Sequence, residues 1–291
     1  MRTKISLLIS GKLGFDLLIY LFDFTDVEFI ATDKNSVEII DFAKVKNVTL
    51  FIGNPRDGKL ASFVNEVKSD LLLSINYLFL IEKDLIEKFK YPINFHGSLL
   101  PKYRGRTPHV WSIINNEIGT GVTAHFIDFG CDTGDIILQK RIPILENDTG
   151  FSVLEKYIEV YPLMVSEIIK LYESSSIIGI KQDNSISTIY GKRTPSDGEI
   201  NWDWQKERVR NWVRAQAFPY PGAFTFYEGN KVTIDKISFY DLGFDNEMPN
   251  GMILQVKPSL VVKTSNGAVK IEEVRNNEFE FIQNKIFKNE N

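Results

Sequence analysis

The chain has 291 residues, a formal net charge of −4 and a sequence pI of about 5.6. This length leaves room for two domains of ordinary size. The acidic balance argues against a nucleic acid partner, which normally requires a basic face. The single cysteine, Cys131, excludes an intramolecular disulfide and suits a reducing compartment. No apolar window approaches the length of a membrane span, so we expect a cytoplasmic protein without a membrane partner.

The first half of the chain alternates short apolar runs with amphipathic stretches. The alternation predicts an α/β fold, with a Rossmann-like, doubly wound, mainly parallel sheet. Strands are predicted at residues 5–10, 28–31, 48–51, 71–75 and 91–96, and helices at 13–23, 35–44, 57–69 and 82–89.

The next segment continues this pattern and leads to a second domain. A helix at 108–116 is predicted, with Thr107 as its N-cap, followed by strands at 122–127 and 136–142 and a long amphipathic helix at 150–174. Residues 174–188 have no clear period, so we interpret them as the crossing between domains. The predicted domains are 1–188 and 189–291.

The second domain has a different character. A helix is predicted at 202–217, and short strands follow at 223–227, 231–239, 260–264 and 268–274. Asn266-Gly267 is a strong signal for a hairpin turn between the last two. These patterns predict a smaller β-rich domain of open-barrel, OB-like type.

Side chains suited to catalysis gather near the ends of two predicted strands. Asn94 and His96 end the strand 91–96, where alternate positions put both side chains on one side. Asp132 lies in the loop after the strand 122–127. An amide can donate to a developing oxyanion, an imidazole can move a proton, and a carboxylate can orient or charge that imidazole. This set of groups favours acyl transfer.

The stretch 94–137, NFHGSLLPKYRGRTPHVWSIINNEIGTGVTAHFIDFGCDTGDII, resembles the core of the 10-formyltetrahydrofolate-dependent formyltransferases. Residues 190–195 (YGKRTP) and 213–223 (VRAQAFPYPGA) most resemble the sugar-nucleotide branch of that family. The resemblance implies that Asn94, His96 and Asp132 are the catalytic residues and that 10-formyltetrahydrofolate is the co-substrate. It also implies an open-barrel C-terminal domain and a homodimer.

Further site residues are expected on the same basis. The cofactor-binding residues are Leu78, Phe79, Leu80, Asp128, Asp132 and Asp135. The basic side chains of the loop 101–106 suit a diphosphate. The expected acceptor-binding residues are Ser98, Lys102, Tyr103, Arg104, Arg106, Thr107, Lys192 and Arg193.

The remaining candidate groups are interpreted as structural. His109 lies inside a predicted helix and His125 in the middle of a predicted strand. A metal site formed by His96, His125 and Asp132 matches no common ligand pattern, so we expect no metal. Cys131 is expected to pack beside Asp132 without acting as a nucleophile.

The resulting hypothesis is an N-formyltransferase that acts on the amino group of a nucleotide-linked amino sugar. The preferred acceptor is dTDP-4-amino-4,6-dideoxyglucose, used for O-antigen or another surface polysaccharide. A 3-amino isomer and a UDP-linked pentose remain open. The alternatives are a methionyl-tRNA formyltransferase, a formyltetrahydrofolate hydrolase and a non-catalytic folate- or nucleotide-binding protein.

Overall fold

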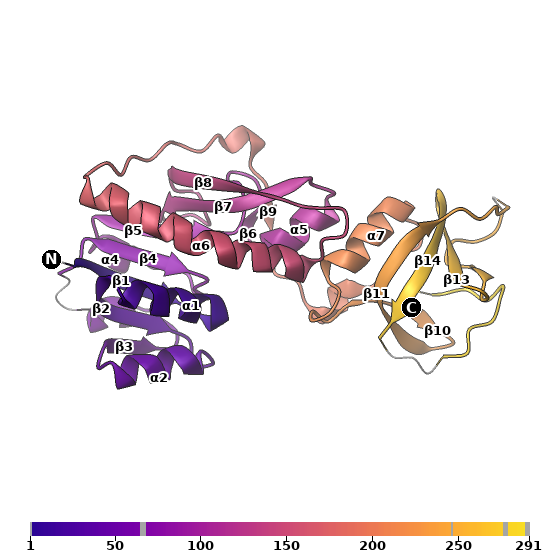
Figure 1. Ribbon diagram of the computed structural model, residues 1–291, viewed down its shortest axis with the longest axis horizontal. Coiled ribbons are helices and arrows are strands. Elements are labelled where there is room, and N and C mark those ends of the chain that lie inside the picture. Colours follow the sequence, from indigo (N-terminus) through magenta and orange to yellow (C-terminus); the bar gives the residue numbers. More distant parts are fainter. Residues whose placement is uncertain (1, 65–67, 246, 276–278, 289–291) are drawn as a thin grey trace. The chain divides into compact units, whose positions relative to one another are not determined.

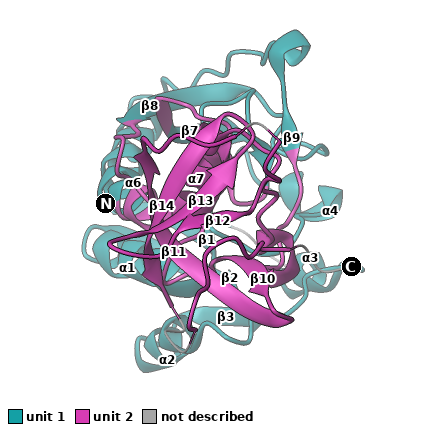
Figure 2. Cartoon of the chain, turned by 90° about the vertical axis from the view of Figure 1, so that its right-hand side faces the viewer, with its two compact units in different colours: residues 1–105, 121–142, 156–189 teal, residues 106–120, 143–155, 190–291 magenta. Residues whose placement is uncertain are grey.

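The structure is a computed structural model that describes residues 2–64, 68–245, 247–275 and 279–288. The chain divides into two compact units, coloured separately in Figure 2. The first unit contains residues 1–105, 121–142 and 156–189, and the second contains 106–120, 143–155 and 190–291.

The larger sheet has seven strands: β1 (Thr3–Ile9), β2 (Thr25–Thr32), β3 (Thr49–Ile52), β4 (Leu71–Ile75), β5 (Tyr91–His96), β7 (Gly119–Phe126) and β8 (Ile136–Pro143). Their order is β3-β2-β1-β4-β5-β7-β8. The first five pair in parallel, whereas β7 is antiparallel to β5. Every residue of β4 is buried, as expected for an apolar run covered on both faces. The predicted mainly parallel sheet is confirmed.

Helices cover both faces of this sheet (Figure 1). On one face, Gly14 of α1 (Gly11–Phe22) lies against Ile9 of β1. Tyr20 of α1 and Ser166 of α6 (Gly150–Glu173) share a hydrogen bond of 2.7 Å, so α6 lies beside α1. Among the helices formed by the described residues, none is long and apolar enough to cross a membrane.

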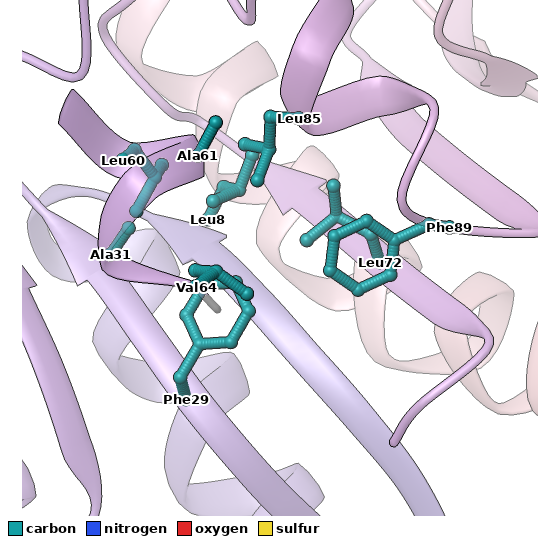
Figure 3. Close-up of a cluster of buried hydrophobic side chains, with 9 residues drawn as sticks. All are labelled: Leu8, Phe29, Ala31, Leu60, Ala61, Val64, Leu72, Leu85 and Phe89. Atoms are coloured by element: carbon teal, nitrogen blue, oxygen red, sulfur yellow. The ribbon is translucent and has the colours of Figure 1, made fainter. Parts of the chain in front are cut away.

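The opposite face carries the hydrophobic cluster shown in Figure 3. Successive strand residues point to opposite faces, so Leu8, next to Ile9 in β1, packs under α3 (Lys59–Phe63) and α4 (Lys83–Ile86). Its members are Leu8, Phe29, Ala31, Leu60, Ala61, Val64, Leu72, Leu85 and Phe89. On the same face as α1, α2 (Val37–Val45) contacts α1, β2 and β3.

The second unit contains a five-stranded antiparallel sheet in the order β10-β11-β14-β13-β12. The strands are β10 (Ala223–Tyr227), β11 (Asn230–Tyr240), β12 (Ile253–Gln255), β13 (Leu260–Thr264) and β14 (Gly267–Val274). α7 (Lys206–Ala215) packs on β11, and α5 (Pro108–Ile114) packs on α7. The predicted β-rich C-terminal domain is confirmed, including the hairpin turn before Gly267.

Several boundaries differ from the prediction. α3 is much shorter than the predicted helix 57–69, of which residues 65–67 lie outside the described residues. α7 begins after 202 because Asn201 starts a turn, with its side chain accepting from the Asp203 amide at 2.9 Å. Thr107 does precede α5, but it has a left-handed φ of 49° and makes no side-chain cap.

Short elements were not predicted. β6 (Arg104–Gly105) pairs with β9 (Ile189–Tyr190). β6 lies in the basic loop 101–106, and β9 directly follows residues 174–188, which show no period. The short 3-10 turns η1 (Asn184–Ile186) and η2 (Pro195–Gly198) are similar cases. Two-residue strands and single turns are too short for a periodic pattern to indicate them.

The Leu72→Ala variant tests the importance of the hydrophobic cluster between the larger sheet and the helices α3 and α4. Leu72 is fully buried, and removing its side chain leaves a cavity, so we expect the free energy of unfolding to fall by about 2–5 kcal/mol. Urea denaturation measures the change. Val45 is 81% exposed, and Val45→Ala should change the same quantity by less than about 0.5 kcal/mol. Equal effects of the two substitutions would contradict this description of the core.

Candidate active site

The site begins with the pairing of two strands. β5 and β7 are antiparallel, and their register places Asn94 opposite His125 and His96 opposite Thr123. Residues two apart on a strand share one face. The two strands therefore present Asn94, His96 and His125 on the same face of the sheet.

Asp132 reaches this face from the loop 127–135 between β7 and β8. One carboxylate oxygen, Oδ2, lies 3.5 Å from His96 Nδ1, and the other, Oδ1, lies 3.4 Å from Asn94 Nδ2. Oδ1 is also 3.6 Å from His125 Nε2. The structure thus brings together the three residues that the sequence predicts as catalytic, and it adds His125 to them.

Carbonyl oxygens that only accept hydrogen bonds fix the orientation of both rings. His96 Nε2 lies 2.7 Å from the Tyr103 carbonyl and must donate to it, so Nδ1 is the nitrogen that faces Asp132. His125 Nδ1 likewise donates to the Phe126 carbonyl at 2.7 Å. When the His125 ring is neutral, its Nε2 therefore accepts from Asn94 Nδ2, at 3.2 Å.

Electrostatics favour an ionised Asp132 and a neutral His96 near pH 7. Burial alone would raise the pKa of the Asp132 carboxyl, but His96, His125 and the backbone N–H of Gly105 hold it well below its usual range. Burial lowers the pKa of the His96 imidazole below its ordinary value, although the Asp132 carboxylate opposes this shift. A neutral imidazole beside a carboxylate can accept a proton and be stabilised as it does so.

Two glycines allow the backbone to approach closely at this point. A Cβ atom at Gly134 would overlap the carbonyl oxygen of Phe126, so only glycine lets the loop return against the end of β7. Gly105 has a φ of +96°, and its N–H donates to Asp132 Oδ2 at 2.9 Å. Both positions help to bring the carboxylate to the ring of His96.

The expected cofactor residues lie in two segments of the first unit. Leu78 and Leu80 follow β4 with 43% and 60% of their surface exposed. Asp128 closes its own loop, since Oδ1 accepts from Thr133 Oγ1 at 2.6 Å and from the Gly130 amide at 3.1 Å. Phe79 and Asp135 are partly buried.

The expected acceptor residues of the first unit differ in accessibility. Lys102 is exposed. Ser98 is fully buried, and its hydroxyl donates to the Lys102 carbonyl at 2.7 Å. Tyr103 is buried and supplies the carbonyl that His96 contacts. Arg104 is only 4% exposed, and its guanidinium donates to Gln182 and Asn184 inside the unit.

The other expected acceptor residues lie in the second unit. Arg106 and Lys192 are exposed, and the Thr107 hydroxyl is buried without a hydrogen-bond partner among the described residues. Arg193 stacks over the rings of Trp111 and Trp212, at 5.1 and 4.3 Å. Its Nη2 donates to the Asp197 carbonyl and to Gln216 Oε1. These contacts give Arg193 an internal packing role.

The part of the chain that the structure describes contains no group of three His, Cys, Asp or Glu side chains arranged to hold a metal ion.

His125 is the functional candidate whose place the sequence analysis missed. The sequence indicated that Thr123 and His125 share one face of a strand, but not that this strand pairs with β5.

His109 belongs to α5 in the second unit and supplies a stability test. Its Nε2 lies 3.0 Å from the Tyr220 hydroxyl, and burial lowers its pKa to about 4. The unfolded chain binds this proton near pH 6.5. The unfolded state therefore takes up more protons between these values, and the folded state loses stability as the pH falls through this window.

We therefore expect His109→Gln to weaken the pH dependence of stability. The fall in unfolding free energy between pH 7 and pH 5 should shrink by about 1–2 kcal/mol in the variant. Chemical denaturation at the two pH values measures it. Tyr220→Phe keeps the titrating ring and serves as the control. An unchanged pH dependence in His109→Gln would contradict the lowered pKa of His109.

Comparisons with known proteins extend these observations. The Formyl transferase family matches residues 30–167, and the family Formyl transferase, C-terminal domain, matches residues 192–289. The methionyl-tRNA formyltransferase of Caldanaerobacter subterraneus subsp. tengcongensis is 32% identical over 253 residues, which are 87% of this chain and 78% of that protein.

Two solved structures have a similar fold. The sugar 3N-formyl transferase WlaRD, solved with dTDP and 5-N-formyl-THF, has a TM-score of 0.72 and 23% identity. The alignment covers 95% of this chain and 99% of WlaRD. A 4-N formyltransferase from Francisella tularensis has a TM-score of 0.67 and 24% identity, over 80% of this chain and 96% of its own.

The fold and the sequence matches together define a two-domain group-transferring enzyme. The chain belongs to the formyl transferase family, whose two domains match most of its length. The family expected from the sequence motifs is thereby confirmed.

Proposed function

We propose that this protein transfers the formyl group of 10-formyltetrahydrofolate to the amino group of a nucleotide-linked amino sugar. The preferred acceptor is a 4-amino-4,6-dideoxyhexose carried on dTDP, such as dTDP-4-amino-4,6-dideoxyglucose, for use in a surface polysaccharide. The cytoplasmic location and the homodimer stay predictions.

One observation carries the proposal: Asn94, His96 and Asp132 meet within hydrogen-bonding or ion-pairing reach in a member of the formyl transferase family. Acyl transfer to an amine needs a donor for the carbonyl oxygen and a group that accepts the proton of the amine. An amide and a neutral imidazole meet both needs at one place.

The reaction can be written with these groups. The neutral amine attacks the formyl carbon, the new C–N bond forms, and the bond from the formyl carbon to N10 of the folate breaks. Asn94 Nδ2 donates to the formyl oxygen as it gains charge. Its present hydrogen bonds, at 3.2 and 3.4 Å, are long, so an incoming oxygen competes with them readily.

His96 and Asp132 handle the proton. Since burial keeps the pKa of His96 below its ordinary value, the ring is neutral near pH 7 and can accept the proton of the amine. Asp132, held ionised, stabilises the imidazolium through Nδ1. The proton then passes to N10 of the departing folate, so the step balances.

Three exposed apolar residues of the first unit, which follow β4 or lie in the loop 127–135, suit contact with a folate. Leu78, Leu80 and Phe129 are large apolar side chains that remain 43%, 60% and 71% exposed in the first unit. Exposed apolar side chains of this size suit contact with a flat heterocycle. Asp128 and Thr133 shape the loop 127–135, since the Thr133 hydroxyl donates to Asp128 Oδ1 at 2.6 Å.

Charge supports a small acceptor over a tRNA. The chain has a net charge of −4, whereas binding the tRNA polyanion calls for an extended basic face. Lys102 is exposed beside the catalytic stretch and suits a single diphosphate. The solved structures with a similar fold include a sugar 3N- and a 4-N formyltransferase.

Methionyl-tRNA formyltransferase is the second candidate function. The observation that favours it is the 32% identity to the Caldanaerobacter enzyme over 87% of this chain. The same three side chains would serve both reactions, so only the acceptor distinguishes them.

An acceptor panel provides the test. Formyl transfer from 10-formyltetrahydrofolate is measured with dTDP-4-amino, dTDP-3-amino and UDP-4-amino sugars, with charged initiator tRNA and with no acceptor. We expect kcat/KM for the best dTDP-amino sugar to exceed that for the tRNA by at least about 100-fold. Transfer to the tRNA alone would favour the second candidate, and formate release without an acceptor would favour a hydrolase.

The catalytic roles are tested by substitution. Asn94→Ala should lower kcat by about 100-fold or more, because the developing oxyanion loses a donor, and His96→Ala should lower it by about 100-fold to 10,000-fold. Both variants should retain binding of the folate and the nucleotide, measured by calorimetry. Asn54→Ala, which removes an exposed amide after β3, is the matched control. Near-full turnover in Asn94→Ala or His96→Ala would refute the assigned role.

A further inference from the structure

Gln182 joins the catalytic loop to a buried arginine in the first unit. We propose that Gln182, oriented by Arg104, is a positioning residue that holds Asp132 where its carboxylate meets His96. This inference rests on the proposed function, because it assigns a purpose to the placement of the catalytic groups.

The hydrogen bonds of Gln182 fix its orientation. Its Nε2 donates to the carbonyl of Asp132 at 2.9 Å and to that of Gly134 at 2.7 Å. Its Oε1 accepts from Arg104, at 3.2 Å from Nε and 2.7 Å from Nη2. A guanidinium can only donate and a carbonyl can only accept, so the amide satisfies its neighbours in one orientation only.

The loop 127–135, which carries Asp132, needs the support of these hydrogen bonds. Asp132 has a φ of +55°, in the left-handed region that residues other than glycine rarely occupy. Holding a residue in that region costs free energy, so the conformation persists only where the surrounding structure fixes it. Gln182 binds the carbonyls on either side of Thr133 and so determines the path of the backbone at the point where the Asp132 side chain leaves it.

Arg104 links the same support to His96. It is 4% exposed, and its Nη2 also donates to Asn184 Oδ1 at 2.8 Å. Its two neighbours touch both ionisable partners: the Tyr103 carbonyl accepts from His96 Nε2, and the Gly105 amide donates to Asp132 Oδ2. The segment 103–105 therefore contacts the ring of His96, the carboxylate of Asp132 and the side chain of Gln182.

The expected consequence concerns the ring. The titratable groups that face His96 are Asp132, whose carboxylate raises the pKa of the ring, and His125, which lowers it. If the loop 127–135 relaxes and the Asp132 carboxylate moves away from His96, burial and His125 still lower the pKa of the ring, but the carboxylate no longer raises it. The pKa of His96 should then fall further below its ordinary value.

The test uses Gln182→Met, which keeps the length of the side chain but removes its hydrogen bonds. The chain has only three histidines, so a ¹³C-histidine NMR titration of the full-length protein resolves His96 once its signal is assigned with a His96 variant. We expect the midpoint of His96 to fall by at least about 0.5 pH unit. With the best acceptor, we expect kcat to fall by about tenfold or more, with KM for both substrates within about threefold.

Asn184→Ala is the matched control. Asn184 also accepts from Arg104, but in the part of the chain that the structure describes it makes no hydrogen bond to the loop 127–135. It should leave the His96 midpoint and kcat near wild type. Gln182→Leu serves if the Met variant does not fold. An unchanged His96 midpoint in a folded Gln182 variant would overturn the proposal. Loss of the cooperative unfolding transition in both variants would overturn it as well, because Gln182 would then serve global stability.

The titration needs no acceptor, so it separates two kinds of failure. If the wild-type protein transfers no formyl group to any acceptor, the proposed function fails, while the His96 midpoint still reports whether Gln182 positions Asp132. If transfer occurs and the midpoint does not move, only the role of Gln182 fails.

Discussion

The contact between the Asp132 carboxylate and two histidine rings is the interaction on which the rest of the site depends. A buried carboxylate is costly unless it is paired and hydrogen-bonded. Here Gly105, Asn94, His96 and His125 surround it at 2.9–3.6 Å. The carboxylate remains ionised for this reason, and its charge makes the neighbouring imidazole able to take a proton.

The fold provides this contact through pairing and close approach. The antiparallel register of β5 and β7 puts Asn94 beside His125, and Gly134 lets the following loop fold back against Phe126. The loop then depends on a distant segment, since Gln182 binds the carbonyls of Asp132 and Gly134. Strands supply the amide and the rings, while irregular backbone supplies the acid and its support.

The sequence predicted those parts that local patterns encode. The apolar run 71–75 and the alternation in 91–96 indicated β4 and β5, and the spacing of Asn94 and His96 put them on one face. His125 was interpreted as structural because it lies in the middle of a strand. Its neighbour in β5 follows only from antiparallel pairing, which periodicity does not reveal. Arg104 was expected at the acceptor because a guanidinium group suits a diphosphate. The sequence does not indicate that Arg104 is buried, because its partners Gln182 and Asn184 lie in a segment without any period.

The central claim is that Asn94, His96 and Asp132 act on one formyl carbon. A crystal structure of the protein with a stable 10-formyl folate analogue tests it most directly. The account predicts the formyl oxygen within about 3.2 Å of Asn94 Nδ2, with the formyl carbon facing the ring of His96. A formyl group bound beyond about 6 Å from both side chains, outside hydrogen-bond reach even through one water, would contradict it.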